Sequence, residues 1–204
     1  MIFLDHDELW LRLLATKAVQ EKIVAEWVWD EKPVAGWVDV QTAMTQAKST
    51  VDQSEAGLAL LEGAVAQAQT ALHAKTKQVV GLAKLRFRND PMKAKVFEGL
   101  RAVGTTVSLT RRSADDLAAA WAKADATGSY VGTSLADYNT LRAALDSAQT
   151  ARESGRTGVK QSKKSQQTTL KSVKGDLVAW YAAATRVFPD NTATGALVRA
   201  EIPT

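Results

Sequence analysis

The chain has 204 residues, of which 46% are hydrophobic and 24% charged, and its formal net charge is +4. This hydrophobic fraction is too high for a disordered chain, and the length suits one domain or two small ones. With no cysteine and two histidines, the chain has no disulfide, no thiol catalysis, no cysteine-ligated metal and no histidine-rich metal site. We therefore expect no enzyme activity, no metal and no cofactor.

The N-terminus lacks the features of a secretory signal, because acidic residues begin at Asp5 where an apolar run is required. No stretch approaches the roughly 18–20 apolar residues that span a bilayer. We therefore expect a soluble cytoplasmic protein without a transmembrane segment.

The distribution of proline predicts an all-α fold. The four prolines leave two long proline-free intervals, 34–90 and 92–188, which are rich in Ala, Leu, Gln, Lys and Glu. Helix interiors exclude proline and favour these residues. No alternating Val/Ile/Thr pattern bounded by turn residues indicates a strand.

In the first half of the chain, apolar residues at three- and four-residue spacing predict a helix over 5–29. A turn over 30–36 follows, and Asp39 is the expected N-cap of a long helix that ends near 88. Pro91 suits the start of a short helix over 92–102.

In the second half, Ser113 is expected to start a helix that ends near 126, followed by a loop over 127–133. Ser134 then caps a second long helix that ends near 187. The tail over 192–204 is expected to be irregular or to hold a short turn of helix.

These elements predict an elongated antiparallel helical bundle made of two tandem helical hairpins, each with a long second arm. The first hairpin is expected over 1–90, and the second, with a short C-terminal tail, over 91–204; the two can also form one domain. An internal repeat at an offset of 98 aligns 39–42 with 137–140 and 54–57 with 152–155. The alternative is that alanine-rich helices align by chance.

Neither histidine has the surroundings of a catalytic or metal-binding residue. His73 lacks a carboxylate at helical spacing, and the acids around His6 suit the N-terminal end of a helix. The segment 99–106 has the glycine spacing of a phosphate-binding loop but lacks its lysine.

Six tryptophans are more than ordinary usage, and four of them belong to the first hairpin. They can fill a bundle core, but residues two apart lie about 200° apart on a helix, so Trp27 and Trp29 cannot share one face. Exposed aromatic residues are typical of interfaces. The candidates for self-association are Trp27, Trp29 and Trp37.

The segment 152–174 carries seven cations against one acid, a net charge of +6, so the rest of the chain sums to −2. On a helix the seven cations fall within an arc of about 120°. They are candidates for binding nucleic acid, lipid or an acidic protein surface, and the alternative is a solvated face. They are Arg152, Arg156, Lys160, Lys163, Lys164, Lys171 and Lys174.

The leading interpretation is a non-enzymatic structural or scaffold protein that associates with itself. Short first arms cannot cover long second arms, so apolar surface is left for identical neighbours in a closed oligomer or a filament. The alternative is a basic helical protein that binds nucleic acid through the 152–174 cations.

Overall fold

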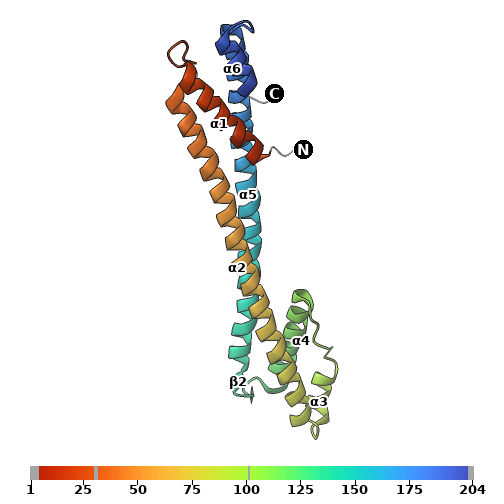
Figure 1. Cartoon of the computed structure of the whole chain (residues 1–204). Helices are drawn as coiled ribbons and strands as arrows, with labels where there is room; N and C mark the ends of the chain where they lie inside the picture. Colours follow the sequence, from red (N-terminus) through yellow and green to blue (C-terminus); the bar gives the residue numbers. More distant parts are fainter. Residues whose placement is uncertain (1–4, 30–31, 101, 202–204) are drawn as a thin grey trace. The chain divides into compact units, whose positions relative to one another are not determined.

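The computed structural model describes residues 5–29, 32–100 and 102–201. Over these residues the chain forms six helices and one short pair of strands (Figure 1). The predicted all-α class is therefore confirmed. The elements in chain order are α1 (His6–Ile23), α2 (Val34–Arg86), α3 (Pro91–Glu98), α4 (Val107–Asp125), β1 (Ser129–Tyr130), β2 (Thr133–Ser134), α5 (Leu135–Val187) and α6 (Ala193–Glu201).

Two of the predicted helix starts are confirmed by their caps. Asp90 accepts a hydrogen bond from the backbone N–H of Lys93 at 3.2 Å, and Pro91 opens α3. At the start of α5, Ser134 and Asp137 form a reciprocal capping box, with both backbone hydrogen bonds at 3.1 Å. The Ser134 hydroxyl and N–H donate to the Asp137 carboxylate and lower its pKa.

The predicted end of the first helix at Trp29 and start of the second at Asp39 are wrong. The N–H groups of Glu26 and Trp27 both bond to the carbonyl of Ile23 at 2.9 Å, which closes α1 in a turn. Helix α2 begins directly after Pro33. Of the turn expected over 30–36, Asp30 and Glu31 lie outside the described residues.

The start of a helix at Ser113 is also wrong. Helix α4 begins six residues earlier, because Thr106 caps it and accepts a hydrogen bond from the N–H of Leu109 at 3.3 Å. The loop after α4 contains the antiparallel pair of β1 and β2. Both residues of the turn between them are left-handed, with φ of 53° at Val131 and 66° at Gly132. This is strained backbone for a β-branched residue.

The chain divides into two compact units. Unit 1 combines residues 1–55 with 158–204, and unit 2 is the segment 56–157. Both long helices contribute to both units. The hairpins predicted over 1–90 and 91–204 are successive segments of the chain and are not the same as these two units. The division into hairpins stays a prediction.

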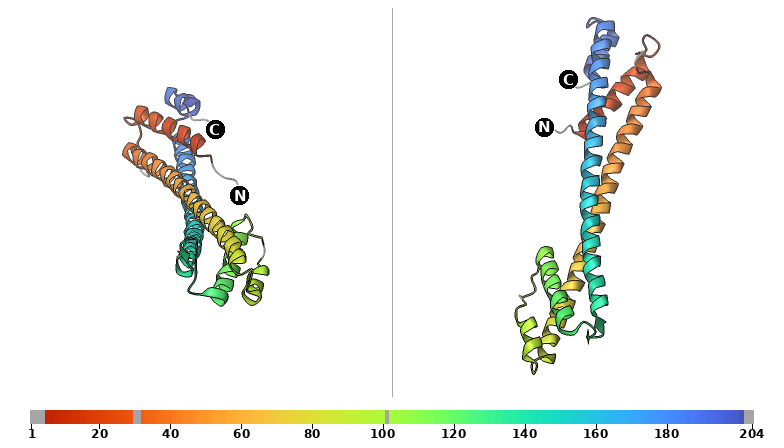
Figure 2. Two further views of the ribbon diagram at one scale, coloured as in Figure 1. Left: turned by 90° about the horizontal axis from the view of Figure 1, so that it is seen from below. Right: turned by 180° about the vertical axis from the view of Figure 1, so that it is seen from behind.

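Unit 1 packs α1 against the beginning of α2 and the end of α5, and α6 lies beside α1 (Figures 1 and 2). Helices α1 and α2 are antiparallel, since Asp7 pairs with Lys48 at 3.7 Å across the hairpin. The indole Nε1 of Trp180 donates to Gln20 Oε1 at 2.6 Å inside the core. The larger buried side chains of this core include Leu13, Ile23, Trp37, Met44, Leu170 and Trp180.

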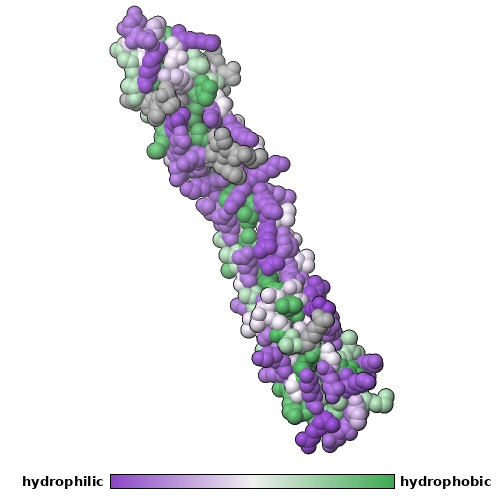
Figure 3. Space-filling model, turned by 90° about the vertical axis from the view of Figure 1, so that its right-hand side faces the viewer, coloured by the Kyte–Doolittle hydropathy of each residue, from purple (hydrophilic) through white to green (hydrophobic). Residues whose placement is uncertain are grey.

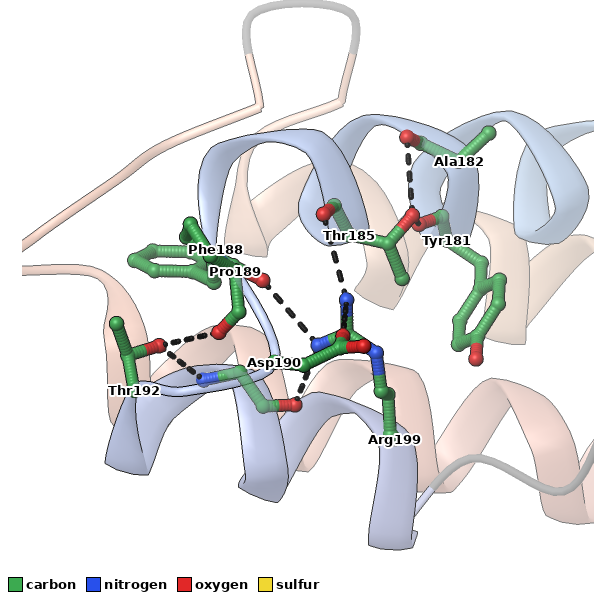
Figure 4. Close-up of polar contacts among 9 residues, drawn as sticks. Tyr181, Ala182, Thr185, Phe188, Pro189, Asp190, Thr192 and Arg199 are labelled. Atoms are coloured by element: carbon green, nitrogen blue, oxygen red, sulfur yellow. Dashed lines mark hydrogen bonds and ion pairs between the residues drawn. The ribbon is translucent and has the colours of Figure 1, made fainter.

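Arg199 connects α6 to the end of α5 within unit 1 (Figure 4). Its guanidinium donates to the carbonyls of Phe188 at 3.2 Å and Gly195 at 2.9 Å and pairs with the carboxylate of Asp190. Phe188 directly follows the last residue of α5, where carbonyls have no intrahelical partner, so Arg199 satisfies a group that would otherwise need water.

Unit 2 packs α4 antiparallel against the beginning of α5, and α3 lies beside α4. Arg111 pairs with Asp146 at 3.1 Å, and Arg142 Nε donates to Asp115 at 3.0 Å. The larger buried side chains of this core include Leu72, Val79, Phe97, Leu117, Trp121, Tyr138 and Leu145.

The predicted pattern of short first arms and long second arms is confirmed in both halves of the chain. The first arms are short, with 18 residues in α1 and 19 in α4, and the second arms α2 and α5 each have 53 residues. The short helices α3 and α6 that follow the second arms have 8 and 9 residues. The chain therefore uses the same succession of helices twice.

Burial along the chain gives the register of this repeat. Val34 and Leu135, which open the second arms, lie 101 positions apart, rather than the 98 of the predicted alignment. At the same offset, buried residues coincide throughout both halves of the chain. The pairs include Leu13 with Ala114, Trp37 with Tyr138, Met44 with Leu145, Val79 with Trp180, Ala83 with Ala184, Phe87 with Phe188 and Phe97 with Val198.

Hydrogen bonds in the loops after the short arms follow the same register. Gln20 Nε2 donates to the carbonyl of Trp27 at 3.0 Å, and Trp121 Nε1 donates to the carbonyl of Gly128 at 3.3 Å. Donors and acceptors are each 101 positions apart. In both halves a side chain of the short arm thus donates a hydrogen bond to a loop carbonyl that would otherwise be unsatisfied, but the side chain is a glutamine in one half and a tryptophan in the other.

Alkaline pH should destabilise unit 2 through Tyr138. Burial raises the pKa of this phenol to about 12, while its hydroxyl shares a hydrogen bond of 2.7 Å with Thr76. Between pH 10 and 12 the unfolded chain loses this proton and the folded chain keeps it, so stability is complete below pH 10 and falls above it. Urea unfolding of the wild type and of Tyr138→Phe from pH 8 to 11.5 checks this, since the variant should show a flatter decline. An equal decline of the free energy of unfolding with pH in the two proteins would contradict this prediction.

Candidate functional site

The seven predicted cations of α5 differ in what they contact. In unit 2, Arg152 pairs with Glu153 at 2.8 Å, and Arg156 contacts Glu153 at 3.4 Å and Glu62 of α2 at 3.6 Å. These two guanidinium groups are therefore engaged by carboxylates of their own unit.

The five lysines belong to unit 1. Lys163 pairs with Glu55 of α2 at 2.6 Å. The others are exposed, and the described part of the chain contains no ion pair with any of them. We call these four residues the lysine stripe: Lys160, Lys164, Lys171 and Lys174. The sequence identified the cluster, but it could not separate the engaged cations from the lysine stripe, because the partners Glu55 and Glu62 come from another helix.

The candidate tryptophans lie in the core of unit 1. Trp37 is completely buried and Trp29 is 8% exposed, and their rings stack at 5.8 Å. Trp27 is partly buried against Trp180 and Phe188, with ring centroids 6.1 and 6.0 Å away. Trp27 and Trp29 follow α1 rather than lying in it, so the argument from opposite helix faces does not apply to them. Their role in self-association stays a prediction.

A surface that the sequence analysis did not single out follows the part of α2 that belongs to unit 2. Its residues recur every three or four positions, so they share one helix face, and all are exposed. Leu60 is 78% exposed, Leu82 40% and Leu85 64%. We call this surface the α2 outer face: Ala56, Leu60, Ala64, Gln67, Ala71, Ala74, Gln78, Leu82 and Leu85.

The repeat shows that the fold does not require apolar residues on this face. At the positions 101 residues later, α5 carries mainly polar residues, with Gln161 in place of Leu60 and Arg186 in place of Leu85. Hydrophilic residues also cover most of the molecular surface seen in Figure 3, where hydrophobic residues form separate patches. Over 56–85, uncharged residues recur every three or four positions, and this spacing is the sequence signal that could have revealed the α2 outer face.

The two histidines take part in local contacts. His6 Nδ1 lies 3.1 Å from Asp7 Oδ1, and its ring stacks on Trp10 at 6.0 Å beside an open hollow of unit 1. His73 Nδ1 lies 3.1 Å from the carbonyl of Gly104 in unit 2. The described residues contain no group of three or more His, Asp or Glu side chains that could hold a metal ion.

No helix within the described ranges has both the length and the apolar character needed to cross a membrane. No family model, curated protein or solved structure matches the chain. The candidate sites are therefore the two surfaces of the long helices, the α2 outer face and the lysine stripe.

Proposed function

We propose that this is a non-enzymatic helical protein that associates with itself, and that the α2 outer face of one copy packs against that of a second. The observation that carries the proposal is the exposure of Leu60, Leu82 and Leu85 on a face without charge. At about 25 cal/mol per Å² of apolar surface removed from water, covering these side chains favours association.

Self-pairing suits this face better than the other surfaces of the long helices. A two-fold dimer brings the same patch of both copies together, so a charged patch meets its own charge. The α2 outer face has no charge to repel its copy, whereas the lysine stripe does. The alanines between the leucines have small side chains, which let two helix backbones approach closely.

Exchanging two leucines for the residues of the other repeat should abolish association without unfolding the chain. Leu60→Gln with Leu85→Arg introduces residues that the fold accepts at the equivalent positions of α5. We expect wild-type protein to form dimers or larger oligomers at about 100 μM and the double variant to be monomeric, since removal of buried apolar surface costs about 1.5–3 kcal/mol per leucine. Multi-angle light scattering measures the molar mass.

The matched control is Leu11→Gln, which removes a leucine that is 66% exposed on α1 and should leave the molar mass unchanged. A wild type that stays monomeric at this concentration would overturn the proposal. So would a double variant that associates as strongly as the wild type.

A further inference from the structure

The lysine stripe forms a narrow line on the part of α5 that belongs to unit 1. Its members follow one another at intervals of four, seven and three residues. At about 100° per residue they fall within an arc of about 80°, and at 1.5 Å per residue they span about 21 Å of helix. Four positive charges thus point in one direction along a straight backbone.

In the part of unit 1 that the structure describes, no ion pair engages these charges. All four side chains are exposed and have no ion pair among the residues that the structure describes, in contrast to Lys163, which Glu55 holds at 2.6 Å. Like charges at helical spacing repel one another, so the stripe destabilises the isolated helix by a small amount.

The repeat gives an independent indication that the stripe is an addition to the fold. The positions 101 residues earlier on α2 carry Ala59, Gly63, Thr70 and His73. The buried positions of the two long helices match in this register, but the lysines have no cationic counterpart in the other half. The same architecture therefore forms without them.

The residues around the stripe distinguish among anionic partners. The segment 160–174 exposes glutamine, serine and threonine but no large apolar side chain, which an interfacial membrane helix would need. It also has no aromatic side chain on which unpaired bases could stack. Double-stranded nucleic acid presents one phosphate charge per about 1.7 Å of its axis and requires only cations in line with it.

We infer that the lysine stripe binds the phosphate backbone of double-stranded DNA without sequence preference. Lysine ammonium groups contact phosphates as point charges, and the absence of base-reading arginine or asparagine in the stripe leaves base sequence unread. This inference does not depend on the proposed self-association, because it uses a different helix and different residues.

Salt dependence provides the test. The full-length protein is titrated into two fluorescent 20-base-pair DNA duplexes of unrelated sequence, and anisotropy is followed from 50 to 200 mM NaCl. Neutralising four phosphates gives a slope of log K against log salt near −3.6, so affinity should fall about 150-fold over this range, equally for both sequences. Replacing all four lysines with glutamine should bring the slope close to zero, and each single replacement should reduce the magnitude of the slope by about 0.9.

The matched control removes the same net charge elsewhere. Lys77, Lys84, Lys95 and Lys123 are exposed, lie in unit 2 and have no ion pair in the described structure. Their replacement by glutamine should leave the slope unchanged, and circular dichroism verifies that both quadruple variants are folded.

Three results would overturn the inference. The first is an absence of DNA binding at 50 mM NaCl, and the second is an equal loss of DNA affinity in the two quadruple variants. The third is binding to anionic phosphatidylserine vesicles or to polyglutamate that depends on the lysine stripe and is stronger than binding to duplex DNA. The Leu60→Gln, Leu85→Arg variant should bind DNA with the same slope of log K against log salt as the wild type, calculated per chain. This result would separate DNA binding from self-association.

Discussion

Replacing Trp180 with alanine should lower the free energy of unfolding of unit 1 by about 3–5 kcal/mol. The indole is completely buried in the core of that unit, so its removal leaves a cavity. It also leaves Gln20 Oε1 without its donor at 2.6 Å, and an unsatisfied buried acceptor costs about 1–3 kcal/mol. Guanidinium unfolding followed by far-ultraviolet circular dichroism measures the change.

Two further variants separate the contributions at Trp180. Trp180→Phe keeps most of the apolar volume but removes the N–H donor, so we expect a smaller loss of about 1–3 kcal/mol. Val178→Ala, on an exposed position of the same helix, should cost less than about 0.5 kcal/mol. A loss below 1 kcal/mol for Trp180→Ala would show that the indole is not part of a close-packed core.

The second large effect concerns a pair of positions that the two repeats fill in opposite ways. Unit 1 holds Gln20 on its short arm and Trp180 on its long helix, and unit 2 holds Trp121 and Val79 at the equivalent positions. All four side chains are buried. Each unit thus accommodates one indole in this part of its core, although the indole comes from a different helix.

Exchanging the pair in unit 1 should therefore rescue two damaging single changes. Gln20→Trp overpacks the core at a cost of about 1–3 kcal/mol, and Trp180→Val leaves a cavity that costs about 2–5 kcal/mol. The double variant reproduces the residues of unit 2, where Trp121 Nε1 already donates to the loop carbonyl that corresponds to the acceptor of Gln20. We expect a favourable coupling energy of at least 1 kcal/mol in a double-mutant cycle.

The control for this cycle combines Gln20→Trp with Leu145→Ala, a buried change in unit 2. Distant sites add, so the coupling energy should lie within about 0.5 kcal/mol of zero. Strict additivity between Gln20→Trp and Trp180→Val would mean that the repeat register of 101 does not describe how the cores are packed.

Local chemistry made much of the architecture predictable. Pro91 and Ser134 mark helix starts because each provides a backbone or capping feature that acts within a few residues. The prediction that Asp39 starts a helix was wrong because an aspartate in an alanine-rich segment looks like an N-cap at any position in that segment. Whether it acts as one depends on Pro33 and the loop before it.

Long-range features were harder to read. The repeat register was wrong by three residues, which is close to one helical turn, so the apolar positions of one alanine-rich helix still fall near those of another. Burial of the pairs Trp37 with Tyr138 and Phe87 with Phe188 selects the offset of 101. The cationic cluster was visible in sequence, but the carboxylates that engage Lys163 and Arg156 lie about 100 residues away.

Those carboxylates have a consequence for how two such halves can exist in one polypeptide. Glu55 corresponds to Arg156 and Glu62 to Lys163 in the repeat, and the ion pairs join Glu55 to Lys163 and Glu62 to Arg156. If two separate copies of the first half dimerised in this way, Glu55 would face Glu62 of its mate, and copies of the second half would set arginine against lysine. In a homodimer encoded by one gene, opposite charges can meet at these positions only if every copy carries an acid at one of the two positions and a base at the other. Covalent fusion removes that restriction, so each half can diverge into the electrostatic complement of the other.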